Sequence, residues 1–138
     1  MPKFEDLTVG DVVAQQDYKI TRDSLVRYAG ASGDFNTIHY RDDIAQAVGL
    51  PGVLAHGMLT MGISIQPVVS WVGDAGRVVD YGVRFTKPLV VPPHGHAALS
   101  VTATIGALDE EAKRARVDLT TTFEENTVLG KAQAWVQF

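Results

Sequence analysis

The chain has 138 residues, of which 46% are apolar, a formal net charge of -4 and no cysteine. This length allows one substantial hydrophobic core, so we expect a single domain over residues 1–138. The acidic balance argues against nucleic-acid binding, the apolar runs are shorter than the roughly 20 residues of a membrane-spanning helix, and the absence of cysteine excludes disulfides and thiolate chemistry.

The first third of the chain predicts an extended segment followed by two short helices. Residues 1–10 lack the basic segment and apolar run of a secretory signal, so we expect a cytoplasmic protein. Residues 4–20 are expected to be extended. The hydroxyl of Thr21 can cap a helix that ends near residues 30–33, and a second short helix is expected over residues 42–48.

Residues 57–72 predict a longer helix that is buried on most sides. Their apolar side chains would point in nearly every direction around a helical axis, which leaves no polar face for water. Pro67 lacks an amide hydrogen and is expected to kink or tighten this helix.

The rest of the chain changes to an alternating pattern of apolar and polar residues, which predicts strands over 79–85, 99–105, 117–123 and 128–138. Turn-forming residues separate the last three, so consecutive strands are expected to pair antiparallel. Together these patterns predict an α+β fold in which an antiparallel sheet wraps around a long central helix. The open edge of such a sheet would invite a partner subunit, and we expect a dimer.

Residues 33–40 form a polar segment with neither helical nor alternating pattern, and it carries two groups that can move protons. Asp34 and His39 occur there with Asn36 between them, and an irregular loop can aim several side chains at one point. Each also has an ordinary explanation. Asp34 and Asn36 are common turn residues, and His39 can be a satisfied or exposed histidine. Their joint occurrence favours a catalytic loop.

Gly57 stands at the start of the predicted buried helix. The first amides of a helix have no partner inside it, so the Gly57 N–H could hold an oxygen that gains negative charge; close packing is the alternative. An acid, a base and such a donor are the groups needed to remove water across carbons 2 and 3 of an acyl thioester. His56, His94 and His96 raise the alternative of a metal site. Their spacing matches no compact metal motif and no cysteine assists them, so we expect neither a metal nor another cofactor.

Two runs, YAGASGDFNTIH and AHGMLTMG, resemble the hydratase motif of MaoC-like proteins and R-specific enoyl-CoA hydratases, and the similarity extends through DYGVRFTKPLVVP. Within this family the runs are especially similar to the beta subunit of the mycobacterial-type (3R)-hydroxyacyl-ACP dehydratase. The resemblance implies the hot-dog fold, a catalytic dyad of Asp34 and His39, a positioning role for Asn36, and an oxyanion hole that includes the Gly57 N–H. Thr37 replaces the proline that is usual in this loop of the family.

The resemblance further implies a hydratase or dehydratase that interconverts (3R)-hydroxyacyl and trans-2-enoyl thioesters of coenzyme A or acyl carrier protein in fatty acid metabolism. The acyl tail would run along the buried helix and the loop before it, with the candidate wall residues Val48, Leu54, Met58 and Met61. Two other functions stay open. One is thioester hydrolysis, which the same fold supports in other families. The other is a binding or structural role as one half of a heterodimer whose activity depends on a related hot-dog subunit. The presence of both Asp34 and His39 favours this chain as the catalytic half, and the expected dimer is either a homodimer or such a heterodimer.

Overall fold

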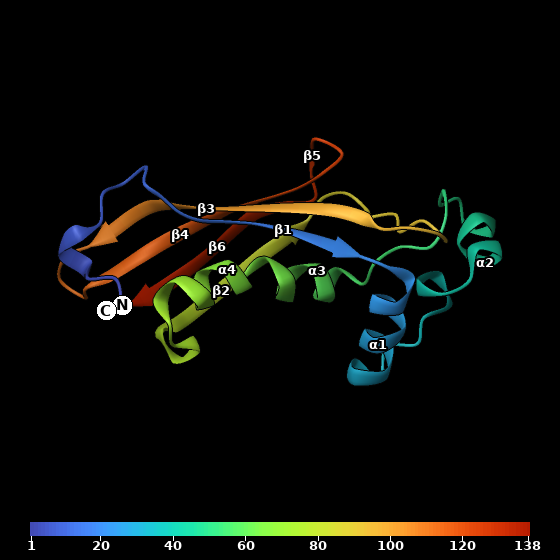
Figure 1. The fold of residues 1–138 in the computed structure, drawn as a ribbon, viewed down its shortest axis with the longest axis horizontal. Coiled ribbons are helices and arrows are strands. Elements are labelled where there is room, and N and C mark those ends of the chain that lie inside the picture. Colours follow the sequence, from blue (N-terminus) through green and yellow to red (C-terminus); the bar gives the residue numbers. More distant parts are fainter.

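The computed structural model describes residues 1–138 and places the main helices against one side of a sheet (Figure 1). The chain begins with the 3₁₀ helix η1 (Phe4–Asp6), strand β1 (Val12–Ile20) and helix α1 (Arg22–Ser32). There follow the 3₁₀ helix η2 (Thr37–His39), α2 (Asp42–Ala47), α3 (Gly57–Ser64), α4 (Gln66–Val72) and the 3₁₀ helix η3 (Ala75–Arg77). The remaining strands are β2 (Val78–Phe85), β3 (Ala97–Asp109), β4 (Arg114–Phe123), β5 (Asn126–Thr127) and β6 (Leu129–Gln137). None of the helices combines the length and the apolar character that crossing a membrane requires.

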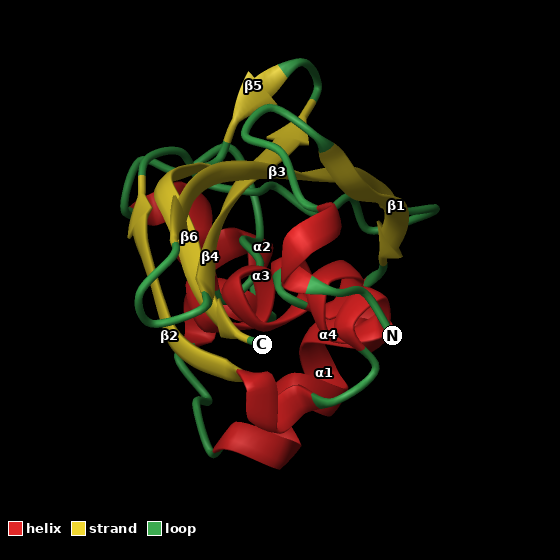
Figure 2. Cartoon of the chain, turned by 90° about the vertical axis from the view of Figure 1, so that its left-hand side faces the viewer, coloured by secondary structure: helices red, strands yellow, loops and turns green.

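The strands form one antiparallel sheet in the order β1-β3-β4-β6-β2, with β5 paired to β4. The chain turns between β3 and β4, and between β4 and β6, where the sequence pattern predicts turns. The predicted strands and their antiparallel pairing are therefore confirmed. Figure 2 shows the sheet curved over α3 and α4, which is the predicted arrangement of sheet and helix.

The core lies between the concave face of the sheet and the helices. Alternate residues of β3, β4 and β6 are buried, as the alternating pattern predicts. Val101, Ala103 and Val117 of the sheet are fully buried, and so are Val68 and Val72 of α4. All of these side chains belong to one continuous buried cluster. The sheet and α4 stabilise each other because each removes the other's apolar face from water.

The predicted single helix over residues 57–72 is instead a pair of helices, α3 and α4, that meet at Ile65. Pro67 lies in the first turn of α4, where its missing amide hydrogen is tolerated. In one continuous helix it would leave the Ile63 carbonyl without its donor. The expectation of burial on most sides also needs correction, because the sheet of one chain covers only part of the helix surface. An exposed stripe at every fourth residue runs along the pair: Met58, Gly62, Gln66 and Ser70.

Candidate active site

The loop between α1 and α2 is shaped by its own polar groups. α1 ends at Gly33, whose left-handed backbone (φ 77°) turns the chain away from the helix axis. The Asp34 carboxylate then accepts from the Asn36 amide at 3.2 Å, and the side-chain oxygen of Asn36 accepts from the Ile38 amide at 3.2 Å. These consecutive turns lead into η2 and bring His39 back towards Asp34. The side chain of Asn36 therefore fixes the backbone of the loop, and its positioning role in catalysis stays a prediction.

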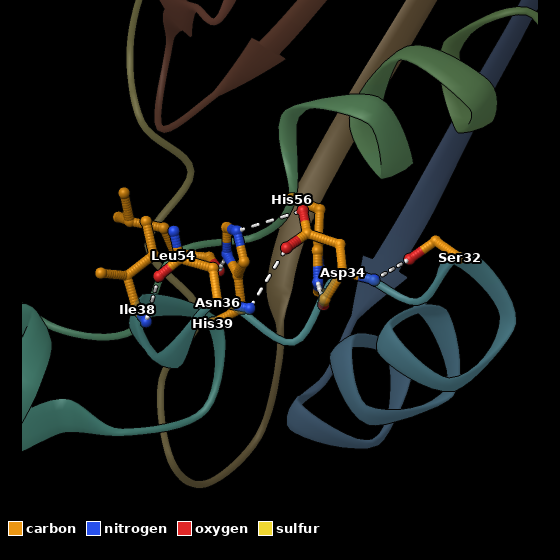
Figure 3. A network of polar contacts seen from close by, with 7 residues as sticks. All are labelled: Ser32, Asp34, Asn36, Ile38, His39, Leu54 and His56. Atoms are coloured by element: carbon orange, nitrogen blue, oxygen red, sulfur yellow. Dashed lines mark hydrogen bonds and ion pairs between the residues drawn. The ribbon is translucent and has the colours of Figure 1, made fainter.

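Asp34 and His39 face each other across a short gap (Figure 3). Oδ2 of Asp34 lies 3.9 Å from Nε2 of His39. The other ring nitrogen of His39, Nδ1, lies 2.7 Å from the carbonyl oxygen of Leu54. A carbonyl oxygen only accepts, so in the neutral ring Nδ1 carries the hydrogen and Nε2 presents its lone pair on the side of Asp34. The His39 side chain is 10% exposed and that of Asp34 is 52% exposed, so a fixed imidazole is paired with a carboxylate that solutes can reach.

α3 presents free amides beside this pair. Neither the amide of Gly57 nor that of Met58 donates to an acceptor within the chain. Both belong to the first turn of the helix, where the helix dipole favours negative charge. A side chain at position 57 would clash with Phe85, because an added Cβ would lie 2.9 Å from the ring carbon Cε1. Glycine therefore allows the aromatic ring to lie directly against the start of the helix.

A cavity of about 490 Å³ connects these groups. Asp34, His39 and Gly57 all line it, so the structure brings the three predicted chemical groups to one space. Another wall comes from the end of β2 with the residues after it, and from the start of β6 with the residue before it. Sequence reasoning missed this wall because these segments are distant from the loop along the chain. Only the alternation within β2, which puts Phe85 among the apolar residues, gave a signal for this wall. Its apolar members are Phe85, Pro88, Leu89, Val128 and Leu129.

Of the four residues predicted to contact an acyl tail, two line the cavity and two lie outside its lining. Leu54 and Met58 line the cavity. Val48 does not; it is 64% exposed and follows the last residue of α2. Met61 also lies outside the lining, and its carbonyl oxygen accepts a hydrogen bond of 2.6 Å from the Tyr81 hydroxyl. The wall of the cavity is thus built by the start of α3 and the segment before it, and less by the middle of the helix.

An ion pair holds the segments around the cavity together. The guanidinium of Arg22 donates to the Asp42 carboxylate at 2.9 and 3.1 Å, and its Nε donates to the Val91 carbonyl at 2.8 Å. The same carboxylate accepts from the Val53 amide at 3.1 Å. Hydrogen bonds from Arg22 and then from Val53 lower the pKa of Asp42. Through these contacts α1, α2 and the two segments that precede α3 and β3 are fixed relative to one another.

His56 is a neighbour of the pair whose position the sequence did not predict. It is 1% exposed, and its ring stacks on that of His39 with 3.8 Å between the centroids. Its Nε2 lies 3.1 Å from the carbonyl oxygen of Asp34. Burial is the largest influence on the pKa of His56 and lowers it. The available signal was its place in the sequence, directly before Gly57 at the start of an apolar helix.

Asp34, His39 and His56 also bring three potential metal-ligand atoms within 4.8 Å of one another. However, Nδ1 of His39 and Nε2 of His56 already contact backbone carbonyls. Nε2 of His39 and the Asp34 carboxylate remain available at the cavity, while the unpaired Nδ1 of His56 is buried, and catalytic zinc sites use three protein ligands. His94 and His96 are exposed before β3 and do not join this cluster. The arrangement suits proton transfer better than metal binding.

Comparison with known proteins gives a consistent family assignment. A family model described as "MaoC like domain" matches residues 4–123. The 3-hydroxyacyl-thioester dehydratase X of Mycobacterium tuberculosis is 39% identical over 74 residues, which make up 54% of this chain and 25% of that protein. The chain therefore spans about a quarter of the length of this curated relative.

Solved structures resemble the whole chain. A MaoC-like dehydratase is 37% identical, with a TM-score of 0.95 over 99% of this chain and 42% of that one. The (R)-hydratase from A. caviae involved in PHA biosynthesis is 18% identical, with a TM-score of 0.84 over 97% of this chain and 98% of that one. These likenesses confirm the predicted α+β hot-dog fold, with two consecutive helices in place of one long central helix.

Proposed function

Because this chain belongs to the MaoC-like domain family, we propose that it is a hydro-lyase that interconverts (3R)-hydroxyacyl and trans-2-enoyl thioesters in fatty acid metabolism. The observation that carries this proposal is the 3.9 Å gap between Nε2 of His39 and Oδ2 of Asp34, at the wall of the cavity. An oxygen atom can lie at hydrogen-bonding distance, about 2.8 Å, from both groups across this gap. That oxygen is the 3-hydroxyl in one direction and the attacking water in the other.

In the dehydration direction, the lone pair on Nε2 of His39 takes a proton from carbon 2, beside the thioester carbonyl. The bond between carbon 3 and its hydroxyl oxygen then breaks, and the departing hydroxyl receives that proton from His39 and leaves as water. Asp34 accepts a hydrogen bond from the hydroxyl and stabilises the imidazolium formed between the two steps. One proton moves from carbon to oxygen, and the enzyme returns to its starting protonation. Hydration follows the same steps in reverse.

The thioester oxygen gains negative charge when the carbon 2 proton is removed, and this charge needs donors. We assign this role to the amide of Gly57, with that of Met58 beside it, because both are free in the first turn of α3. Donors already fixed in a helix do not have to reorient when the charge develops.

The acyl group would extend from this point along Leu54 and the Met58 side chain, which line the cavity. Val48 and Met61 remain predictions as contacts of a longer tail. Coenzyme A and acyl carrier protein present the same thioester to these groups, so the catalytic proposal holds for either carrier.

The test is the ultraviolet absorbance of crotonyl-CoA mixed with the purified protein, together with a thiol assay on the same sample. We expect the conjugated enoyl absorbance to fall without release of thiol. Asp34→Asn and His39→Ala should each lower kcat by about 10² to 10⁴-fold. His96→Gln, a change at an exposed histidine away from the cavity, is the control. Thiol release that depends on Asp34 and His39 would instead identify a thioesterase.

We also infer that the active form is a dimer with a second copy or a related hot-dog subunit. Phe35 and Phe85 lie beside the groups of the site and are 61% and 56% exposed, and Met58 of α3 is 58% exposed. Exposed apolar surface of this kind marks an interface, and the edge strand β2 has one unpaired side. Sedimentation of the purified chain, with activity measured in the same sample, tests this. An inactive monomer that gains activity with a hot-dog partner would support a heterodimer, and a fully active monomer would refute the inference.

A further inference from the structure

His56 contacts three parts of the candidate site. Its ring stacks on His39 at an interplanar angle of 23° and meets the edge of Tyr28 with 4.7 Å between the centroids. Its Nε2 reaches the backbone carbonyl of Asp34 at 3.1 Å. It is also the residue directly before α3, so its carbonyl carbon is linked covalently to the Gly57 nitrogen. The side chain is 1% exposed and contributes to the cavity lining beside Asp34 and His39, so these contacts can fix the groups at the cavity wall.

The hydrogen bond to Asp34 determines which ring nitrogen of His56 carries hydrogen. A backbone carbonyl oxygen has no hydrogen to give, so Nε2 is the donor. The other nitrogen, Nδ1, is buried and has no hydrogen-bond partner. A second proton there would be a buried donor without an acceptor, on a ring stacked against His39. His56 is therefore neutral in the folded protein, with its hydrogen on Nε2.

We propose that His56 is a positioning residue, whose neutral Nε2–H form ties the backbone of Asp34 to the ring of His39 and to the start of α3. It touches no reacting atom. Its function is to keep the 3.9 Å gap between Asp34 and His39 at a width that one oxygen can bridge. This inference rests on the proposed hydratase function, because the gap matters only if an oxygen reacts there.

Two substitutions separate the contacts of His56. His56→Phe keeps a flat ring that can stack on His39 but removes the donor to Asp34. His56→Gln keeps an amide donor but removes the ring. We expect His56→Phe to lower kcat for crotonyl-CoA hydration by about 10- to 100-fold with KM changed by less than about threefold, because misplaced groups slow the chemical step more than binding. His56→Gln should recover part of this loss, and His96→Gln should leave both constants unchanged.

A separate measurement on the unmodified protein does not depend on whether these variants fold. Nitrogen-15 spectra of the imidazole rings should show His56 as the neutral Nε2–H tautomer at neutral pH. A protonated ring, or hydrogen on Nδ1, would overturn the proposal. So would a folded His56→Phe protein with unchanged kcat, or one in which only KM rises. If the unmodified protein shows this tautomer but does not hydrate crotonyl-CoA, the result would contradict the proposed function and not the tautomer of His56.

Discussion

Replacing Gly57 by alanine tests whether the close approach of Phe85 to α3 matters for catalysis. The added Cβ would lie 2.9 Å from Cε1 and 3.0 Å from Cδ1 of Phe85, whereas ordinary contacts begin at 3.4 Å. The ring or the helix start must therefore move by about half an ångström or more. Phe85 is 56% exposed, so its ring can yield, and alanine favours a helix over glycine by about 1 kcal/mol. We expect the free energy of unfolding to change by less than about 1 kcal/mol.

Activity should respond more strongly than stability. A displacement of this size at the cavity wall and the Gly57 amide should lower kcat for crotonyl-CoA hydration by about tenfold. In a Phe85→Ala background the clash is absent, so Gly57→Ala should then lower kcat by less than about twofold. Urea denaturation of all four proteins shows that differences in kcat do not reflect unfolding. An equal loss of kcat in both backgrounds would refute the reasoning, because the contact with Phe85 would not be its cause.

Three further predictions concern stability. Ser64 and Thr121 share a buried hydroxyl hydrogen bond of 2.9 Å, so Ser64→Ala should lower the free energy of unfolding by about 1–3 kcal/mol. The double change with Thr121→Val should cost less than the sum of the single changes in urea denaturation. Burial lowers the pKa of His56 below its ordinary value of 6.5, so the unfolded chain binds the proton more readily and stability falls as the pH drops below that value. In His56→Gln the urea midpoint should change less with pH between about pH 7 and pH 5 than in the unmodified protein. An unchanged dependence of the midpoint on pH would contradict this. Arg22 lowers the pKa of Asp42 below its ordinary value of 3.8, so the pair stabilises above that pH and the effect is lost as the pH falls through the lowered pKa. Wild-type protein should then lose more stability than Arg22→Met between about pH 5 and pH 3, measured as the urea midpoint.

The sequence alone determined the features that depend on neighbours along the chain. Thr21 accepts from the Ser24 amide at the start of α1, and Gly33 ends the same helix in the left-handed conformation. The alternating residues of β3, β4 and β6 are the ones that the sheet buries. The loop that carries Asp34 and His39 was also recognisable, because its polar residues fit neither a helical nor a strand period. Caps, turns and periodicity act over a few residues, so a sequence pattern suffices to indicate them.

The tertiary structure decided how these segments meet. The width of the gap between Asp34 and His39 depends on the Leu54 carbonyl, which is held in place by pairing of the segment before α3 with the segment before β3. The burial of His56 and the approach of Phe85 to Gly57 follow from the same long-range contacts. No local pattern encodes such distances, because they depend on strand register and on packing between segments far apart in the chain. The sequence therefore indicates which chemical groups are present, whereas the folded structure determines how far apart they lie.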